Sequence, residues 1–194
     1  MIAWDKIQIS LNSGDLAILP TETVYGLAGA ARFPMAIDAI YAAKGRDFDK
    51  PLAVVVPDLP TAEILAEFSE TSRDLADKFW PGPLTLVLNA KKNLPLDTRT
   101  LGTFEGQTTI ALRCPDTEWR SKLTGPLALT SANQSGQPDL TRMEDVEKLP
   151  SAFFENIQWS IESDEPMSGK ATTILRVSGN EIIVLRQGEL DISK

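Results

Sequence analysis

The sequence predicts a single-domain α/β fold in which helices flank a twisted, mixed β-sheet. Short apolar runs that are typical of buried strands alternate with segments whose apolar residues recur at helical spacing. The run 52–56 is almost wholly apolar, as expected of a strand covered on both faces of its sheet. The chain has 194 residues, and no repeat, low-complexity tract or linker divides it, so one domain is expected over residues 1–194.

The individual elements follow from this pattern in order along the chain. The first half predicts a helix around 4–11 that stops near Gly14, a strand over 16–19, a helix around 37–41, the strand 52–56, and helices around 64–68 and 75–79. The second half predicts strands over 84–88 and 110–112, a short helix around 119–123, a strand over 127–130, a helix over 143–149, and strands near 173–175 and 182–185. The long polar segment 91–107 is expected to be a flexible loop.

Composition excludes several classes of function. The chain has no histidine, so the commonest general base and metal ligand is missing, and with Cys114 as its one cysteine no zinc site is expected. A single cysteine permits no internal disulfide, which agrees with a reducing cytoplasm. The net charge of −8 argues against broad, non-specific binding to nucleic acids. The sequence has no run of membrane-spanning length and no signal-peptide pattern, so a cytoplasmic protein without membrane contact is expected.

The segment 20–27, Pro-Thr-Glu-Thr-Val-Tyr-Gly-Leu, directly follows the first predicted strand. It gathers hydroxyl groups, a carboxylate and a glycine in a loop at a strand end, where rigid scaffolds often hold reactive groups. A strand cap followed by a tight turn at Gly26 is the alternative, because hydroxyls also satisfy loop backbone. Within this loop, Glu22 is left with two roles: to orient Lys44 or Arg46, or only to cap the loop.

Three cations, Lys44, Arg46 and Lys50, lie close together in a chain that is otherwise acidic. They flank a loop that leads into the buried strand 52–56, where a phosphate group could be clamped. The alternative is that they only compensate the C-terminal dipole of the preceding helix.

Polar residues also follow or end several later strands. The segment 130–136, Thr-Ser-Ala-Asn-Gln-Ser-Gly, has the small residues that let backbone N–H groups approach phosphate. A P-loop and a Rossmann fingerprint are both absent, so no flavin or nicotinamide cofactor is expected. The segment 80–85, with two prolines around a glycine, is interpreted as a structural turn. Further polar residues at predicted strand ends, for which structural salt bridges remain the alternative, are Thr109, Arg113, Thr172, Thr173 and Arg186.

Taken together and in this order, these segments resemble the YrdC-like family of threonylcarbamoyl-AMP synthases, called TsaC in bacteria. The matching pieces are the 20–27 segment, Lys-Gly-Arg with Lys-Pro-Leu, Trp-Pro-Gly-Pro-Leu-Thr, Arg-Cys-Pro, Thr-Ser-Ala-Asn-Gln-Ser-Gly and Arg-Gln-Gly. They extend from Pro20 to Gly188, and their joint order is highly specific. The resemblance implies a YrdC-like sheet with a concave substrate cleft, and the length fits the single-domain bacterial form.

The resemblance also implies a reaction. Members of the family convert L-threonine, bicarbonate and ATP into L-threonylcarbamoyladenylate and pyrophosphate, with Mg²⁺ accompanying ATP. The product feeds the t6A modification of tRNA at position 37, and separate transfer enzymes act downstream, so direct tRNA binding is expected to be weak or absent. Two rival functions remain: an RNA-binding or ribosome-associated module without turnover, and a carbamoyl-handling domain like that of hydrogenase-maturation proteins.

Site residues are implied by matching the family motifs to this chain. The residues expected to contact threonine are Thr23, Tyr25, Val55, Arg113, Ser131 and Thr172. The residues expected to bind the nucleotide are Lys44, Arg46, Lys50, Thr109, Asn133, Thr141 and Arg186. Of these, Lys44 and Arg46 are expected to be catalytic, by stabilising the charge that develops at the α-phosphate. The chain departs from the family pattern at Asp47, where many relatives have proline, and at 172–176, where Arg176 replaces a carboxylate.

Overall fold

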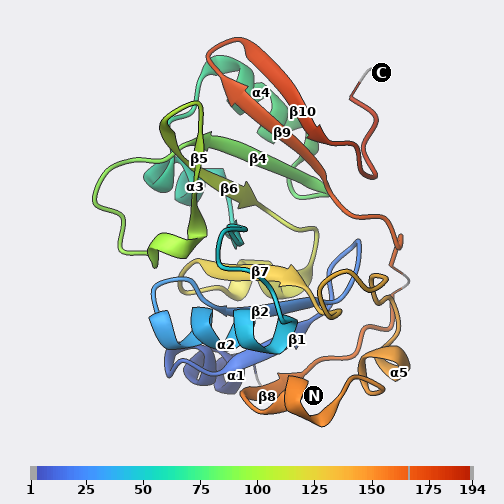
Figure 1. The fold of residues 1–194 in the computed structure, drawn as a ribbon. Helices are drawn as coiled ribbons and strands as arrows, with labels where there is room; N and C mark the ends of the chain where they lie inside the picture. The colour runs from blue at the N-terminus through green and yellow to red at the C-terminus, as the bar shows by residue number, and fades with distance from the viewer. Residues whose placement is uncertain (1–3, 166, 193–194) are drawn as a thin grey trace.

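The computed structural model describes residues 4–165 and 167–192, and its ten strands form one mixed sheet (Figure 1). The strands are β1 Leu16–Leu19, β2 Gly26–Ala30, β3 Ala53–Val55, β4 Leu84–Asn89, β5 Leu101–Phe104, β6 Gln107–Arg113, β7 Leu127–Ser131, β8 Ile157–Ser160, β9 Thr173–Ser178 and β10 Glu181–Arg186. Their order is β10-β9-β4-β6-β3-β7-β2-β1-β8, with β5 paired to β6. Three neighbouring pairs, β1–β8, β3–β6 and β4–β9, are parallel and the others are antiparallel, which confirms the predicted mixed sheet.

The helices begin and end at residues whose chemistry suits these positions. They are α1 Trp4–Asn12, α2 Pro34–Lys44, α3 Leu59–Leu65, α4 Glu70–Phe79 and α5 Met143–Val146, with 3₁₀ turns at Thr98–Thr100, Glu118–Lys122 and Ser151–Phe154. The side chains of Asp58 and Ser69 cap α3 and α4 by accepting hydrogen bonds from backbone N–H groups of the first turn. Helix α2 ends at Gly45, which adopts the left-handed conformation that favours glycine (φ +56°).

Helices cover most of one sheet face. Because successive residues of a strand point to opposite faces, Ala128 of β7 and Val54 of β3 identify this face. Ala128 packs in a cluster with Ile37 and Ile40 of α2. Val54 packs in a second cluster with residues of α3 and α4. This face therefore holds most of the hydrophobic core.

The opposite face is covered only at one end, and we call it the cleft face. There Val55 and Leu127 pack with Ile7 and Leu11 of α1 and with Trp119. The remainder of the face, across β2, β3, β7, β6, β4 and β9, borders a cavity. The site described below lies on this uncovered part of the cleft face.

Several elements differ from the sequence prediction. Strand β2 was not predicted because Gly-Leu-Ala-Gly-Ala is wholly buried and lacks both β-branched residues and alternation. The predicted loop 91–107 contains strand β5, which forms a hairpin with β6 through Glu105 and Gly106, both at positive φ. The Glu-Gly pair is a weaker turn signal than Asn-Gly or Asp-Gly, so this hairpin was missed.

The remaining differences concern extent or type. Strand β8 was also missed, and its four residues alternate between intermediate burial and exposure. Helix α3 starts at Leu59, earlier than the predicted 64–68, because Asp58 caps it. The predicted helix 143–149 is confined to Met143–Val146, and the predicted helix 119–123 is a 3₁₀ turn. In the part of the chain that the structure describes, no helix is long and apolar enough to cross a membrane.

Candidate active site

A cleft of about 240 Å³ opens on the cleft face. Strands β2, β3, β4, β6, β7, β9 and β10, together with the loop after α2, contribute side chains to its wall. Three guanidinium groups line it, those of Arg46, Arg113 and Arg186. Because one cavity gathers three cations in a chain of net charge −8, its chemistry suits anionic ligands.

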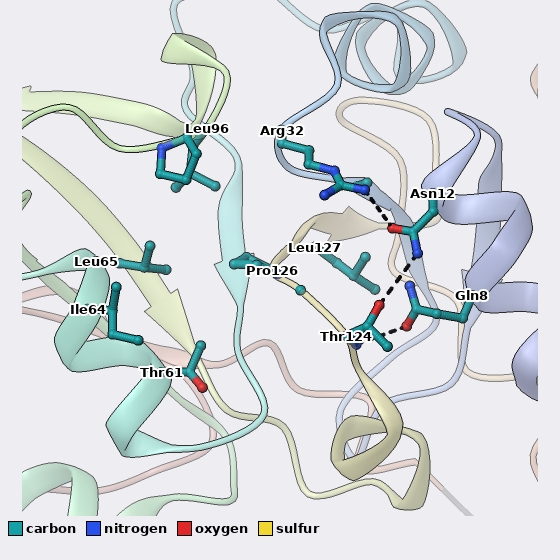
Figure 2. A pocket seen from close by; sticks show the side chains of 13 residues that line it. Gln8, Asn12, Arg32, Thr61, Ile64, Leu65, Leu96, Thr124, Pro126 and Leu127 are labelled. Carbon is teal, nitrogen blue, oxygen red and sulfur yellow. Dashed lines mark hydrogen bonds between the residues drawn. The ribbon is translucent and has the colours of Figure 1, made fainter.

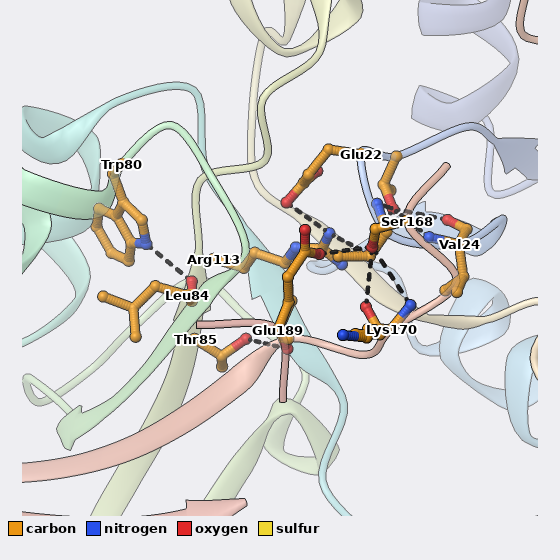
Figure 3. A network of polar contacts seen from close by, with 12 residues as sticks. Glu22, Val24, Trp80, Leu84, Thr85, Arg113, Ser168, Lys170 and Glu189 are labelled. Atoms are coloured by element: carbon orange, nitrogen blue, oxygen red, sulfur yellow. Dashed lines mark hydrogen bonds and ion pairs between the residues drawn. The ribbon is translucent and has the colours of Figure 1, made fainter. Parts of the chain in front are cut away.

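Arg113 projects from the end of β6 and is only 6% exposed. Its guanidinium donates to the Glu22 carboxylate over 3.0 Å and to the Thr23 hydroxyl over 2.8 Å (Figure 3). The Thr23 hydroxyl also lies 2.9 Å from that of Thr21, which in turn hydrogen-bonds to the Val24 carbonyl. This chain of contacts fixes the 20–27 loop against β6, so the sequence-predicted loop does belong to the cleft.

Arg186 approaches the cleft from β10. It donates from Nε to the Thr172 carbonyl and from Nη2 to the Thr172 hydroxyl, each over 3.0 Å. The same hydroxyl lies 3.0 Å from that of Thr85 on β4. Burial lowers the pKa of Arg186, and the nearby Asp139 partly opposes this shift. The group nevertheless stays charged at neutral pH, because the ordinary pKa of an arginine lies far above neutral pH.

Lys44 lies beneath the cleft, not in its wall. The side chain is 4% exposed, and its ammonium donates to the Ser131 carbonyl over 2.6 Å, to the Asn133 side-chain oxygen over 2.9 Å, and to the Asn133 carbonyl. The pKa of Lys44 is lowered to about 8, chiefly by burial and also by the charge of Arg46, whereas the charge of Asp139 opposes both effects. Lys44 therefore ties the end of α2 to the loop that follows β7.

Arg46 lies in the loop that follows α2. It donates to the Thr130 hydroxyl and to the Pro51 carbonyl, each over 3.3 Å. Both partners are neutral, and no ion pair involves Arg46 among the described residues. Its positive charge is thus available to a ligand in the cleft.

The structure brings six of the thirteen predicted site residues into the wall of the cleft. Those that line it are Thr23, Arg46, Arg113, Ser131, Thr172 and Arg186. Thr109 is buried on β6, on the same side of the strand as the lining residue Ala111. Asn133 is buried and serves Lys44 as a partner. Thr141 is half-buried and lies outside the lining residues.

Three predicted contacts point elsewhere in this structure. The Tyr25 side chain packs in the core under α2, and its hydroxyl accepts a hydrogen bond from the Ser163 N–H over 3.1 Å. Val55 is fully buried in the cluster around Trp119, at the covered end of the cleft face. Lys50 is exposed and forms an ion pair with Asp47 over 3.6 Å, at the position where the chain departs from the family pattern.

Sequence reasoning also missed several contributors. The sequence left Glu22 with two roles, to orient Lys44 or Arg46 or only to cap the loop, and the structure instead pairs its carboxylate with Arg113, which lies 91 positions further along the chain. Thr85 was assigned to a purely structural turn, yet it lines the cleft. The segment 80–85 also forms the structural turn that the sequence predicted. The Trp80 indole N–H donates a hydrogen bond across this turn to the Leu84 carbonyl (Figure 3).

A second cavity, of about 430 Å³, lies where β7 begins, at the opposite end of that strand from the cleft (Figure 2). Ile64, Leu65 and Leu96 form one side of it, and Gln8 and Arg32 lie on the other. It is the larger of the two cavities, but Arg32 is its one cation among the described lining residues. The smaller cleft is therefore the better candidate for a site that must gather several anions.

Comparison with known proteins decides the family. Residues 10–188 match the family model Sua5/YciO/YrdC, which is described as telomere recombination. The chain belongs to this family. It is 36% identical, over 97% of its length, to a Pyrococcus abyssi protein named threonylcarbamoyl-AMP synthase. It is 30% identical, over 94% of its length, to a Methanocaldococcus jannaschii protein named putative threonylcarbamoyl-AMP synthase.

The family likeness extends to three dimensions. A crystal structure of Pyrococcus abyssi Sua5 complexed with L-threonine superposes on the whole chain with a TM-score of 0.85 and 35% identity. This confirms the YrdC-like fold expected from the motifs. The chain spans 56% of the Pyrococcus abyssi relative and 84% of the Methanocaldococcus jannaschii relative.

Proposed function

We propose that this chain is a threonylcarbamoyl-AMP synthase, which joins L-threonine, bicarbonate and ATP into L-threonylcarbamoyladenylate and pyrophosphate. The observation that supports the proposal most strongly is the convergence of Arg46, Arg113 and Arg186 in one cleft. The names of the relatives and the threonine complex of one of them agree with it. The product would serve the first step of t6A37 modification of tRNA, and downstream transfer enzymes would act on it in the cytoplasm.

The proposed chemistry has two steps. The amine of threonine first condenses with bicarbonate, which releases water and leaves an N-carboxylate. An oxygen of this carboxylate then attacks the α-phosphorus of ATP, the bond to the β-phosphate oxygen breaks, and pyrophosphate leaves. Phosphoryl transfers of this kind depend on positioning and on electrostatic stabilisation, so a protein nucleophile is not needed. This requirement matches a cationic cleft in a chain without histidine.

We assign the cations of the cleft to the substrates from the partners that each cation already has. Arg113 would hold the carboxylate of threonine, with the Thr23 hydroxyl beside it. Arg46 and Arg186 would hold the phosphates of ATP, because both are hydrogen-bonded only to neutral groups among the described residues. Lys44 would support this end by adding its charge from below and by fixing the loop 131–137.

Magnesium would enter together with ATP. Among the described residues, no group of three acidic or cysteine side chains is arranged to hold a metal ion by itself. Asp139 is the one carboxylate among the residues that line the cleft, so it is the side chain placed to face a cation bound to the phosphates. The ion would neutralise phosphate charge, while the arginines orient the nucleotide.

The test is pyrophosphate release by the purified protein, with each substrate omitted in turn. Release that requires threonine, bicarbonate and ATP together supports the proposal. Arg46→Ala should weaken transition-state stabilisation by about 2–4 kcal/mol, as expected when one preorganised donor is lost. The matched control is Arg73→Ala, which removes an arginine that pairs with Glu63 on the surface and should keep wild-type activity. Tight RNA binding without ATP turnover would instead favour the RNA-binding function.

A further inference from the structure

The three guanidinium groups of the cleft differ in one respect, which is the presence of a carboxylate partner. Arg113 forms an ion pair with Glu22 over 3.0 Å, and both side chains are largely buried, with exposed fractions of 8% and 17%. Arg46 and Arg186 donate to hydroxyl and carbonyl oxygens and form no ion pair within the described residues. Arg113 is therefore ion-paired before any ligand binds, whereas, among the described residues, Arg46 and Arg186 have only the unpaired carboxylate of Asp139 in the same cleft wall.

The Glu22 carboxylate is fixed in this position. The Glu22 carbonyl accepts a hydrogen bond from the Ser168 N–H over 3.0 Å, and the Thr23 carbonyl accepts one from the Gly169 N–H over 2.9 Å. The second carboxylate oxygen of Glu22 is buried and has no hydrogen-bond partner. The backbone of Glu22 is held and its side chain is largely buried, so its carboxylate is fixed beside Arg113 in this structure.

We propose that Glu22 is a specificity-determining residue that keeps phosphate groups away from Arg113. This inference rests on the proposed function. A zwitterionic amino acid carries one negative charge, and its carboxylate needs only hydrogen-bond donors from the paired guanidinium. A phosphate or pyrophosphate bound at Arg113 carries more charge, and it would be repelled more strongly by the carboxylate on the other side of that guanidinium. Glu22 thus directs phosphate groups to Arg46 and Arg186 and leaves Arg113 to the carboxylate of an amino acid.

The primary experiment measures inorganic phosphate binding by calorimetry at constant ionic strength, without nucleotide or threonine. Glu22→Gln should gain a phosphate site at least about tenfold tighter than any wild-type site at Arg113, because a repulsive charge next to that site has been removed. The double variant E22Q/R113Q should lose the gained site. Glu63→Gln, which removes the carboxylate from a surface Glu–Arg ion pair, should leave phosphate binding unchanged.

A second arm links the new site to threonine. In Glu22→Gln, threonine should compete with phosphate, whereas Glu22→Asp, which keeps the charge, should behave like the wild type. Circular dichroism and thermal melting of each variant show whether it is folded. Equal phosphate binding by folded wild type and Glu22→Gln would overturn the inference. A gained phosphate site with which threonine does not compete would leave the role of Glu22 intact and refute the assignment of threonine to Arg113, which is part of the proposed function.

Discussion

The Lys44 ammonium donates a hydrogen bond over 2.9 Å to the side-chain oxygen of Asn133, a residue 89 positions away in the chain. The same group reaches the backbone carbonyls of Ser131 and Asn133. One buried cation thus holds together the end of α2 and the loop after β7. Both segments border the cleft, since Arg46 follows α2 and Ser131 lines the wall.

Lys44 predicts a pH dependence of the reaction. Its pKa in the folded protein is about 8, chiefly because burial disfavours the charged form. If its charge supports phosphate binding, kcat/KM for ATP should fall as the pH rises through about 8, since this ratio reports ionisations of the free enzyme. Lys44→Arg should remain charged and retain activity to higher pH, provided that its melting curve shows an intact fold. A wild-type profile that is flat from pH 7 to about 9.5 would contradict the role of Lys44.

The same group links stability to pH. The pKa of Lys44 is lower in the folded than in the unfolded state, so the unfolded state binds more protons between about pH 8 and the usual lysine pKa. Between these pH values, the contribution of Lys44 to the free energy of unfolding should therefore rise with pH. Below about pH 8 this contribution should be constant. Denaturant unfolding of wild type and Lys44→Met at pH 7.0, 8.5 and 10 measures this, because the difference between them should change only above about pH 8.

The Thr172 hydroxyl predicts a difference between two conservative substitutions. It bridges Thr85 and the Nη2 group of Arg186, each over 3.0 Å. Thr172→Val keeps the shape and removes the hydroxyl, so the KM for ATP should rise about tenfold or more, because a hydrogen bond to a charged group contributes about 1.5–3 kcal/mol. Thr172→Ser should stay within about twofold of the wild type. Equal KM values for the two variants would show that this hydroxyl does not position Arg186.

The space around Gly29 of β2, under α2, is too small for a larger residue. A Cβ atom added there would lie 2.7 Å from the Leu16 side chain and 3.0 Å from the Ala36 side chain. Gly29→Ala should therefore destabilise the fold by about 1–3 kcal/mol through overpacking. Gly125→Ala is the matched control, since its Cβ would meet nothing within 4 Å. Chemical denaturation of both variants measures the difference, and equal loss of stability would contradict this account of β2.

The fold and the site were predictable from sequence to different degrees. Strands such as β1 and β4 are compact apolar runs, so local pattern was sufficient to predict them. Strand β2 contains two glycines and two alanines among its five residues, and only its pairing on both sides, with β1 and β7, makes it a strand. Whether such a segment forms a strand depends on its tertiary contacts, which the local sequence pattern does not show.

The candidate site shows the same division. The motifs predicted the residue types of the cleft, including Arg46, Arg113 and Arg186. They did not predict pairing, because the partner of Glu22 lies on a strand that becomes its neighbour only after folding. The motifs also did not predict the direction in which each side chain points. The Tyr25 side chain points into the core, although its neighbours Thr23 and Val24 line the cleft.

The central claim is that one cleft joins threonine, bicarbonate carbon and AMP, and mass spectrometry of the product tests it most directly. The purified protein would be incubated with Mg-ATP, L-threonine and ¹³C-labelled bicarbonate, and the nucleotide product isolated rapidly. The account predicts an adenylate that carries both threonine and the labelled carbon, formed together with an equal amount of pyrophosphate. Conversion of ATP without a threonine-bearing, labelled adenylate would contradict it.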